Sequence, residues 1–202
     1  MTPRGTTGPR TKPPAERRAE LMAAALRLFL EQGVAPTTIE QITAGASVAK
    51  GTFYLHFSSK DDVLAALREH FVQQLLANIE AAVSQCGKQD WRGKLEAWAT
   101  ASIAGYLDAL PLHDIVFQEF HPHTREEDSD NVLVDHLGAL LDGGTAAGAW
   151  RVEDSRFTAV FLFNGYHGIV NDALVKEKRP NRGRLARKVA VIFFQAAGLP
   201  SG

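Results

Sequence analysis

Cysteine is nearly absent from this sequence, since Cys86 is the only one among 202 residues. A single cysteine excludes a disulfide within the chain and a cysteine-based zinc finger, and it is typical of a reducing cytoplasm. Long apolar runs are also missing, so no segment reaches the roughly 20 residues of a membrane-spanning helix. No segment sustains the alternation of apolar and polar residues that marks a strand. We therefore expect a cytoplasmic, helical protein with no membrane partner.

Charge is unevenly distributed along the chain. The net charge is only −1, but residues 1–60 hold eight Lys or Arg against four Glu. That balance of +4 leaves −5 for the remainder. A basic end indicates contact with a polyanion, although a flexible basic tail without a partner explains the charge equally well. Residues 1–14 are polar, rich in Pro and Gly and without the apolar core of a secretory signal, so we expect a disordered arm.

Apolar residues recur at steps of three or four along most of the chain, which is the spacing of a buried helical face. Leu21, Ala25 and Leu28 show this spacing first, in a helix expected to start after Pro14 and to end at Gly33. Similar stripes continue almost to the C-terminus. The pattern predicts an all-α fold with about nine helices.

Residues 37–60 hold the most specific pattern. Thr37 and Glu40 have the spacing of a capping box, so a helix is expected to start near Thr38. Residues 45–48 form a turn, and a short helix is expected over residues 49–57. In such a helix-turn-helix, the second helix lies in the major groove of DNA and the first crosses the backbone. The side chains expected to be buried between the helices are Ile39, Ile42, Val48, Phe53 and Phe57.

Eight residues of this motif are predicted to contact DNA. Lys50 suits guanine O6 or N7, with a phosphate contact as an equal alternative, and Thr52 suits a thymine methyl. Tyr54 and His56 carry polar ends that a core would waste, so phosphate oxygens are their expected partners. Lys60 is also expected at a phosphate, so that Lys60→Ala would lower the salt slope of binding by about 1. The full set is Thr38, Ala49, Lys50, Gly51, Thr52, Tyr54, His56 and Lys60.

The motif closely resembles the DNA-binding domain of the TetR family of bacterial transcription regulators. The matching residues are Phe29, Gly33, Thr37, Thr38, Ile42, Ala46, Val48, Lys50, Gly51, Thr52, Tyr54, His56, Phe57, Ser59 and Lys60. The resemblance implies a homodimer with an all-helical effector domain, which represses transcription and leaves double-stranded operator DNA when a small molecule binds. It predicts a DNA-binding domain over residues 15–60 and a ligand-binding and dimerisation domain over residues 61–202.

Three positions depart from the family pattern. Thr43 replaces alanine, and if it is buried its hydroxyl must bond back to a carbonyl. Ser47 replaces the turn glycine, which matters if that residue needs a positive φ. Ala49 replaces a serine and removes one cap from the second helix of the motif.

The last two expected helices carry apolar faces wider than one helix buries against its own core. By resemblance these faces would form a four-helix bundle across a two-fold axis, and an ordinary intrachain core is the alternative. The expected dimer contacts are Phe157, Val160, Phe161, Ile169, Val189, Ile192 and Phe193. Earlier, Gly143, Gly144 and Gly148 are expected to break the helical pattern.

A pocket for a small apolar or aromatic ligand needs apolar walls and a few convergent polar groups. Asn164, His167 and Asn171 share one helical face and could meet a ligand, or could equally bond across the dimer seam or to nearby backbone. The aromatic residues among the candidates are also typical of a core. The candidates are Trp98, Ser102, Tyr106, Phe117, Phe120, His121, Asn164, Tyr166, His167 and Asn171.

Acidic and imidazole side chains gather between residues 113 and 128, among them His121 and His123. A His-x-His pair can chelate a metal, but the spacing matches no metal motif. We therefore expect no metal, no cofactor and no catalytic residues. The sequence predicts a ligand-released repressor rather than an enzyme. The alternatives are a regulator without a small-molecule inducer, and a metal-responsive or enzymatic protein with a vestigial helix-turn-helix.

Overall fold

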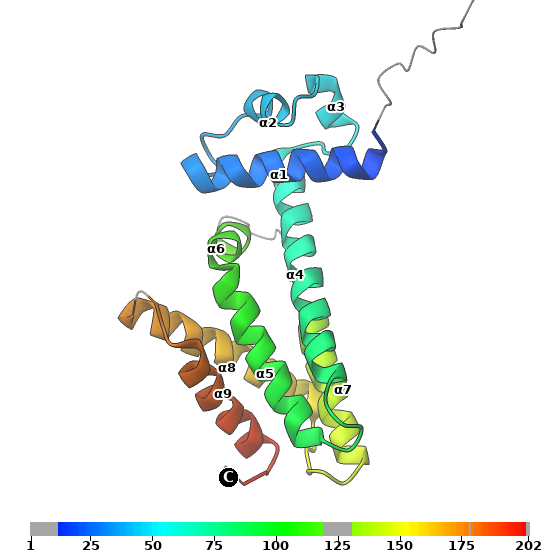
Figure 1. The fold of residues 1–202 in the computed structure, drawn as a ribbon, viewed down its shortest axis with the longest axis vertical. Helices are drawn as coiled ribbons and strands as arrows, with labels where there is room; N and C mark the ends of the chain where they lie inside the picture. Colours follow the sequence, from blue (N-terminus) through cyan, green and yellow to red (C-terminus); the bar gives the residue numbers. More distant parts are fainter. Residues whose placement is uncertain (1–11, 119–130, 178, 201–202) are drawn as a thin grey trace, which may run out of the picture. The chain divides into compact units, whose positions relative to one another are not determined.

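The computed structural model describes residues 12–118, 131–177 and 179–200. The regular structure of these residues is all helical and comprises nine helices, as the apolar spacing predicts (Figure 1). Described residues 12–68 and 114–118 form one compact unit, and the remaining described residues form a second. The helices are α1 Pro14–Gln32, α2 Ile39–Gly45, α3 Lys50–Tyr54, α4 Lys60–Ser84, α5 Trp91–Asp108, α6 Leu110–Gln118, α7 Val132–Ala146, α8 Ser155–Lys176 and α9 Arg182–Ala196.

The first unit is organised around α1, which packs against α2. Proline at the first position of α1 is compatible with a helix start because that position needs no N–H donor. Leu21, Ala25 and Phe29 lie at i, i+4 and i+8 and are all buried. Gly33 ends the helix with φ of 87°, and its N–H donates to the Phe29 carbonyl over 2.9 Å. The expected bounds of this helix are confirmed.

The start of α2 is capped one residue later than predicted. Thr38, not Thr37, is the N-cap, and its Oγ1 accepts from the Gln41 N–H over 3.2 Å. The Gln41 side chain in turn accepts from the Thr38 N–H over 2.8 Å. Thr37 is buried and donates to the Gly33 carbonyl over 2.7 Å. Two adjacent threonines make the register ambiguous in sequence, because both offer a hydroxyl before the helix.

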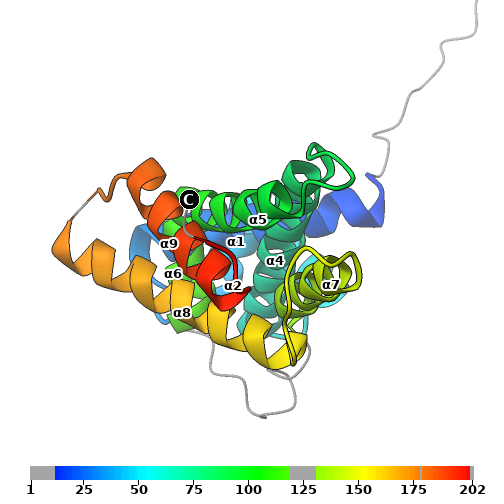
Figure 2. The same cartoon turned by 90° about the horizontal axis from the view of Figure 1, so that it is seen from below.

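The second unit has one core built mainly from α5, α7, α8 and α9. Helix α9 packs against α5 on one side and α8 on the other, and α7 packs against α8 (Figure 2). Trp98 is fully buried in this core, with its ring against those of Tyr166 and Phe193. Each of these aromatic side chains buries roughly 150–250 Å².

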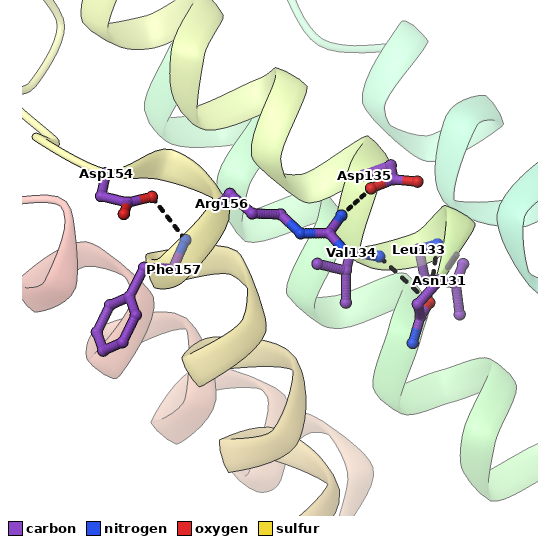
Figure 3. A network of polar contacts seen from close by, with 7 residues as sticks. All are labelled: Asn131, Leu133, Val134, Asp135, Asp154, Arg156 and Phe157. Carbon is purple, nitrogen blue, oxygen red and sulfur yellow. Dashed lines mark hydrogen bonds and ion pairs between the residues drawn. The ribbon is translucent and has the colours of Figure 1, made fainter. Parts of the chain in front are cut away.

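Helices α7 and α8 are joined at their N-termini by polar contacts (Figure 3). The Asn131 side chain accepts from the Leu133 and Val134 N–H groups, which caps α7. Asp154 caps α8 by accepting from the Phe157 N–H over 2.8 Å. An ion pair between Arg156 and Asp135 links the two helices.

Two glycines expected to interrupt the helical pattern instead lie inside α7. A Cβ at Gly144 would fall 2.1 Å from the Trp150 ring, and one at Gly143 would fall 2.8 Å from the Trp91 ring. Each indole therefore occupies the space of a missing side chain. The close approach explains why glycine is present without ending the helix. Gly148, with φ of 72°, lies just beyond the helix end.

The division between the two units falls within α4, whereas the sequence placed a domain boundary at residue 60. Val63, Leu64 and Leu67 are buried in the first unit, and the core of the second begins at Phe71. No helix that the structure describes is both long and apolar enough to cross a membrane.

Candidate nucleic-acid interface

The helix-turn-helix has its own apolar interior. Ile42, Phe53 and Phe57 are buried as predicted, while Ile39 and Val48 are partly exposed. The Phe53 and Phe57 rings lie 5.8 Å apart between centroids. The angle between α2 and α3 is therefore fixed by side chains that do not face solvent.

The opposite side of α3 is open. Ala49, Lys50, Gly51 and Tyr54 are exposed, and Thr52 and His56 are partly exposed. A Cβ added to Gly51 would meet no atom within 4 Å, so another surface can approach the backbone closely there. Leu55 is 81% exposed beside them, and the sequence alone gave no sign of this. The face combines donors, small residues and one apolar side chain.

The three departures from the family pattern have distinct local effects. Thr43 is buried and donates to the Glu40 carbonyl over 3.0 Å, as a buried hydroxyl must. Ser47 adopts φ of 56°, the only positive value among the non-glycine residues described. This left-handed conformation costs an L-residue about 1–2 kcal/mol. Ala49 is the N-cap of α3 and provides no side-chain hydrogen bond.

Lys60 has a different contact from the one expected of it. Its Nζ donates to the carbonyls of Val34, Ala35 and Thr37, at 2.8, 3.1 and 2.7 Å. These bonds employ all three N–H donors of the ammonium. Lys60 therefore ties the first residue of α4 to the α1–α2 connection, and it has no donor left for a phosphate in this conformation.

Lys50 forms an ion pair with Glu40, which the sequence analysis singled out only as a capping-box residue. Their Nζ and Oε1 atoms lie 2.6 Å apart, and more than half of each side chain is exposed. The hydrogen bond from Lys50 lowers the pKa of the Glu40 carboxyl, and the same bond raises the pKa of Lys50. The two residues are ten positions apart and meet only because the turn folds α3 back beside α2.

Several of the candidates for a ligand pocket form hydrogen bonds within the chain. Trp98 donates to His136 over 3.1 Å, Ser102 donates to the Trp98 carbonyl, and Tyr106 donates to Asn171 over 2.8 Å. These contacts satisfy the polar ends of buried side chains within the core. Tyr166 is the exception, since its buried hydroxyl has no hydrogen-bond partner among the described residues.

Among the remaining pocket candidates, His167 packs against the rings of Tyr106 and Tyr166. Asn164 is exposed and donates to the Val160 carbonyl, whereas His167 is mostly buried and lies 2.8 Å from the Phe163 carbonyl. Phe117 lies in the first unit, where Arg68 stacks over its ring. That these residues share one ligand pocket stays a prediction, because helical spacing fixes a face and not what covers it. Phe120 and His121 lie outside the described residues.

A groove of about 390 Å³ lies instead between α4 and α5. Its wall on α5 is made of small residues, which leave space beside the larger residues of α4. None of the pocket candidates lines it. The lining residues are Phe71, Gln74, Leu75, Asn78, Ala101, Ala104, Gly105, Asp108 and Ala109.

The apolar face expected at a dimer interface is only partly outside the core. Phe157 and Phe161 are 71% and 64% exposed on α8, and Val160 and Ile192 are also exposed. Ile169 is partly buried. Val189 and Phe193 are each 1% exposed, so their assignment to the dimer face is corrected: they pack in the core of their own chain.

Of the histidines considered as metal ligands, only His113 belongs to the part of the chain that the structure describes. His113 is buried against the rings of Phe71 and Tyr106. Among the residues the structure describes, no group of three His, Cys, Asp or Glu side chains could hold a metal ion. His121 and His123 lie outside that part of the chain.

Known proteins share the helix-turn-helix. Residues 21–67 match the family model of bacterial regulatory proteins, tetR family. The transcriptional repressor KstR2 of Rhodococcus jostii is 33% identical over 120 residues, which are 56% of this chain and 57% of that protein. KstR2 of Mycolicibacterium smegmatis is 29% identical over 147 residues, 68% and 69% of the two chains. The chain covers 20%, 57% and 30% of the length of the first three relatives, less than two thirds of each.

Solved structures share the fold over nearly the whole chain. The fatty acid degradation regulator FadR from Bacillus halodurans has a TM-score of 0.73 at 21% identity, covering 91% of this chain and 96% of that one. A putative TetR-family regulator from Syntrophomonas wolfei has a TM-score of 0.74 at 22% identity, covering 92% and 97%. The motif, its buried interior and these relatives identify residues 21–67 as a helix-turn-helix domain similar to that of the tetR family of bacterial regulatory proteins, and the chain shares its fold with solved structures described as members of that family.

Proposed function

We propose that this protein is a DNA-binding transcription regulator of the cytoplasm that acts as a repressor. The observation that carries the proposal is the exposed face of α3, which presents Lys50, Gly51 and Tyr54 on a helix held by a buried aromatic interior. The N-terminal residues of such a helix reach base edges in the major groove. Similarity to relatives named as repressors supports repression rather than activation.

Each exposed side chain has a role that its chemistry supports. Lys50 can donate to guanine and Thr52 can contact a thymine methyl. Tyr54 and His56 can donate to phosphate oxygens, and so can the Thr38 hydroxyl at the start of α2. Lys60 is left out of the contact set, because its ammonium is used within the chain.

A homodimer would present two such faces to one duplex. The exposed apolar side chains of α8 and α9 give a chain of this kind a reason to pair. Two-fold symmetry of the protein then matches a palindromic operator, with half-sites about 34–36 Å apart or a multiple of it. Occupying such a site blocks the promoter that contains it.

Release by a small molecule is supported by the groove between α4 and α5, whose lining is mainly apolar and includes the polar residues Gln74, Asn78 and Asp108. A ligand there would favour one of two conformations and so change DNA affinity. The satisfied polar groups of Trp98, Ser102 and Tyr106 support the rival, a regulator without an inducer.

Selection from random-sequence duplexes tests DNA binding directly. We expect the full chain to enrich an inverted repeat that it binds about 1,000-fold or more tighter than a scrambled duplex, with steep salt dependence. Failure to enrich any sequence would contradict the proposed function. Stability retained in that case would favour the vestigial helix-turn-helix.

Phe161→Asp is expected to break the dimer. Its ring is exposed on α8, and a carboxylate at the same place in both subunits would be buried with a like charge. We expect the concentration for half-dissociation to rise about 100-fold or more, measured by sedimentation equilibrium. Val132→Asp, on an exposed apolar residue of α7, is the matched control and should remain dimeric. If the two variants dissociate at the same concentration, the dimer interface does not include this face of α8.

A further inference from the structure

The face proposed to meet DNA contains an acidic side chain. Glu40 lies in the first turn of α2, and its carboxylate meets the ammonium of Lys50 at the first position of α3. The two groups are 2.6 Å apart and both are more than half exposed. An exposed ion pair contributes little to stability, and a carboxylate in the first turn of a helix adds only a small further contribution.

Beside DNA this carboxylate has two consequences. It is repelled by phosphates, and it neutralises the one cation at the start of α3. In a non-specific complex, a Lys50 that stays paired with Glu40 releases no counterion from the duplex. Glu40 therefore lowers affinity for duplexes in general.

A G·C base pair offers the ion pair matching partners. Guanine presents O6 and N7 side by side as acceptors in the major groove, and cytosine presents its N4 amino donor beyond them. An ammonium has three N–H donors and a carboxylate accepts several bonds, so the paired groups keep capacity for both. In an A·T pair the adenine N6 donor separates the two acceptors, so the lysine finds no adjacent pair of acceptors.

We propose that Glu40 is a specificity-determining residue of the DNA-binding face, which reads one G·C pair jointly with Lys50 and suppresses binding elsewhere. The inference rests on the proposed function, because it requires α3 to enter the major groove. It adds a residue to the contact set and assigns that residue a base, cytosine.

The test compares the full chain with Glu40→Gln on the duplex obtained by selection and on a scrambled duplex, over a series of KCl concentrations. Glu31→Gln is the matched control, since it removes one exposed carboxylate of the same unit without touching the ion pair. Circular dichroism establishes that the variants remain folded.

We expect Glu40→Gln to bind the scrambled duplex more tightly, with a log–log salt slope steeper by about 0.9, because Lys50 becomes free to contact a phosphate. The ratio of specific to non-specific affinity should fall about tenfold or more. Replacing each G·C pair of the selected site by A·T should reveal one position in each half-site where Glu40→Gln loses less affinity than the unchanged chain.

Identical ratios and slopes for Glu40→Gln and Glu31→Gln would overturn the inference and leave DNA binding intact. So would equal losses by both proteins at every G·C position. If the unchanged chain does not distinguish the selected duplex from the scrambled one, the proposed function itself fails, and that result is separate from the comparison of variants.

Discussion

Lys60→Met is expected to destabilise the DNA-binding unit by about 2–3 kcal/mol, because three carbonyls lose a charged donor while the aliphatic stem is kept. Two of those carbonyls belong to buried residues, Val34 and Thr37, where water replaces the ammonium poorly. Urea unfolding followed by far-UV circular dichroism measures the loss. The salt slope of DNA binding should stay unchanged, in contrast to the fall of about 1 expected of a phosphate contact.

Lys50→Met is the matched control for this substitution. It removes the same ammonium from an exposed ion pair of the same unit, so we expect unfolding close to that of the unchanged chain. A Lys60→Met protein of unchanged stability, with a lower salt slope, would show that the ammonium leaves the carbonyls for DNA. That result would restore the phosphate contact predicted from the sequence.

The second large effect is expected on acidification of the second unit. His167 is packed among Phe163, Tyr166 and Tyr106, and it donates from Nδ1 to the Phe163 carbonyl. Burial lowers its pKa to about 4, with His113 acting in the same direction and the carbonyl bond opposing them. In the unfolded chain the ring has an ordinary pKa near 6.5.

The direction in which stability changes with pH follows from proton binding. Between pH 6.5 and 4 the unfolded chain binds the proton and the folded chain does not, so acid favours unfolding. His167 therefore supports the fold fully above about pH 6.5, and about 2–3 kcal/mol is lost as the pH falls to about 4. Burial also lowers the pKa of His136, which adds to the loss in the same direction.

Urea unfolding at a series of pH values measures this dependence. His167→Phe keeps a ring in the site. It should remove the part of the fall in unfolding free energy between pH 6.5 and 4 that is due to His167. His70→Gln removes an imidazole from an exposed position of α4 and should leave the slope as it is. An undiminished slope in His167→Phe would mean that the ring is hydrated and binds its proton in the folded state.

The helices and the buried side of the motif could be predicted because they depend on local periodicity and caps. Phe53 and Phe57 are buried where the spacing places them, and Gly33 ends α1. The glycines of α7 escaped prediction because the indoles that cover them, those of Trp91 and Trp150, come from outside the helix and are placed there only by the fold. Periodicity also could not tell Val189 and Phe193, which face their own core, from Phe161, which faces solvent.

The polar contacts of the site were the hardest to predict. Lys60 carries the residue type of a phosphate contact, yet it caps carbonyls 23 to 26 residues earlier in the chain. Glu40 and Lys50 meet across the turn, at a separation that no helical pairing rule covers. A charged side chain reaches several neighbours, so its partner is decided by how the helices pack.

The close fit of Trp91 and Trp150 on the glycines of α7 has a spectroscopic consequence. These two residues and Trp98 are the three tryptophans of the chain, and all belong to the second unit. Tryptophan emission therefore follows the melting of that unit, while circular dichroism sees helices of both. A denaturation curve recorded by both signals separates the two units without any added label, because a transition seen by circular dichroism and not by tryptophan emission belongs to the first unit.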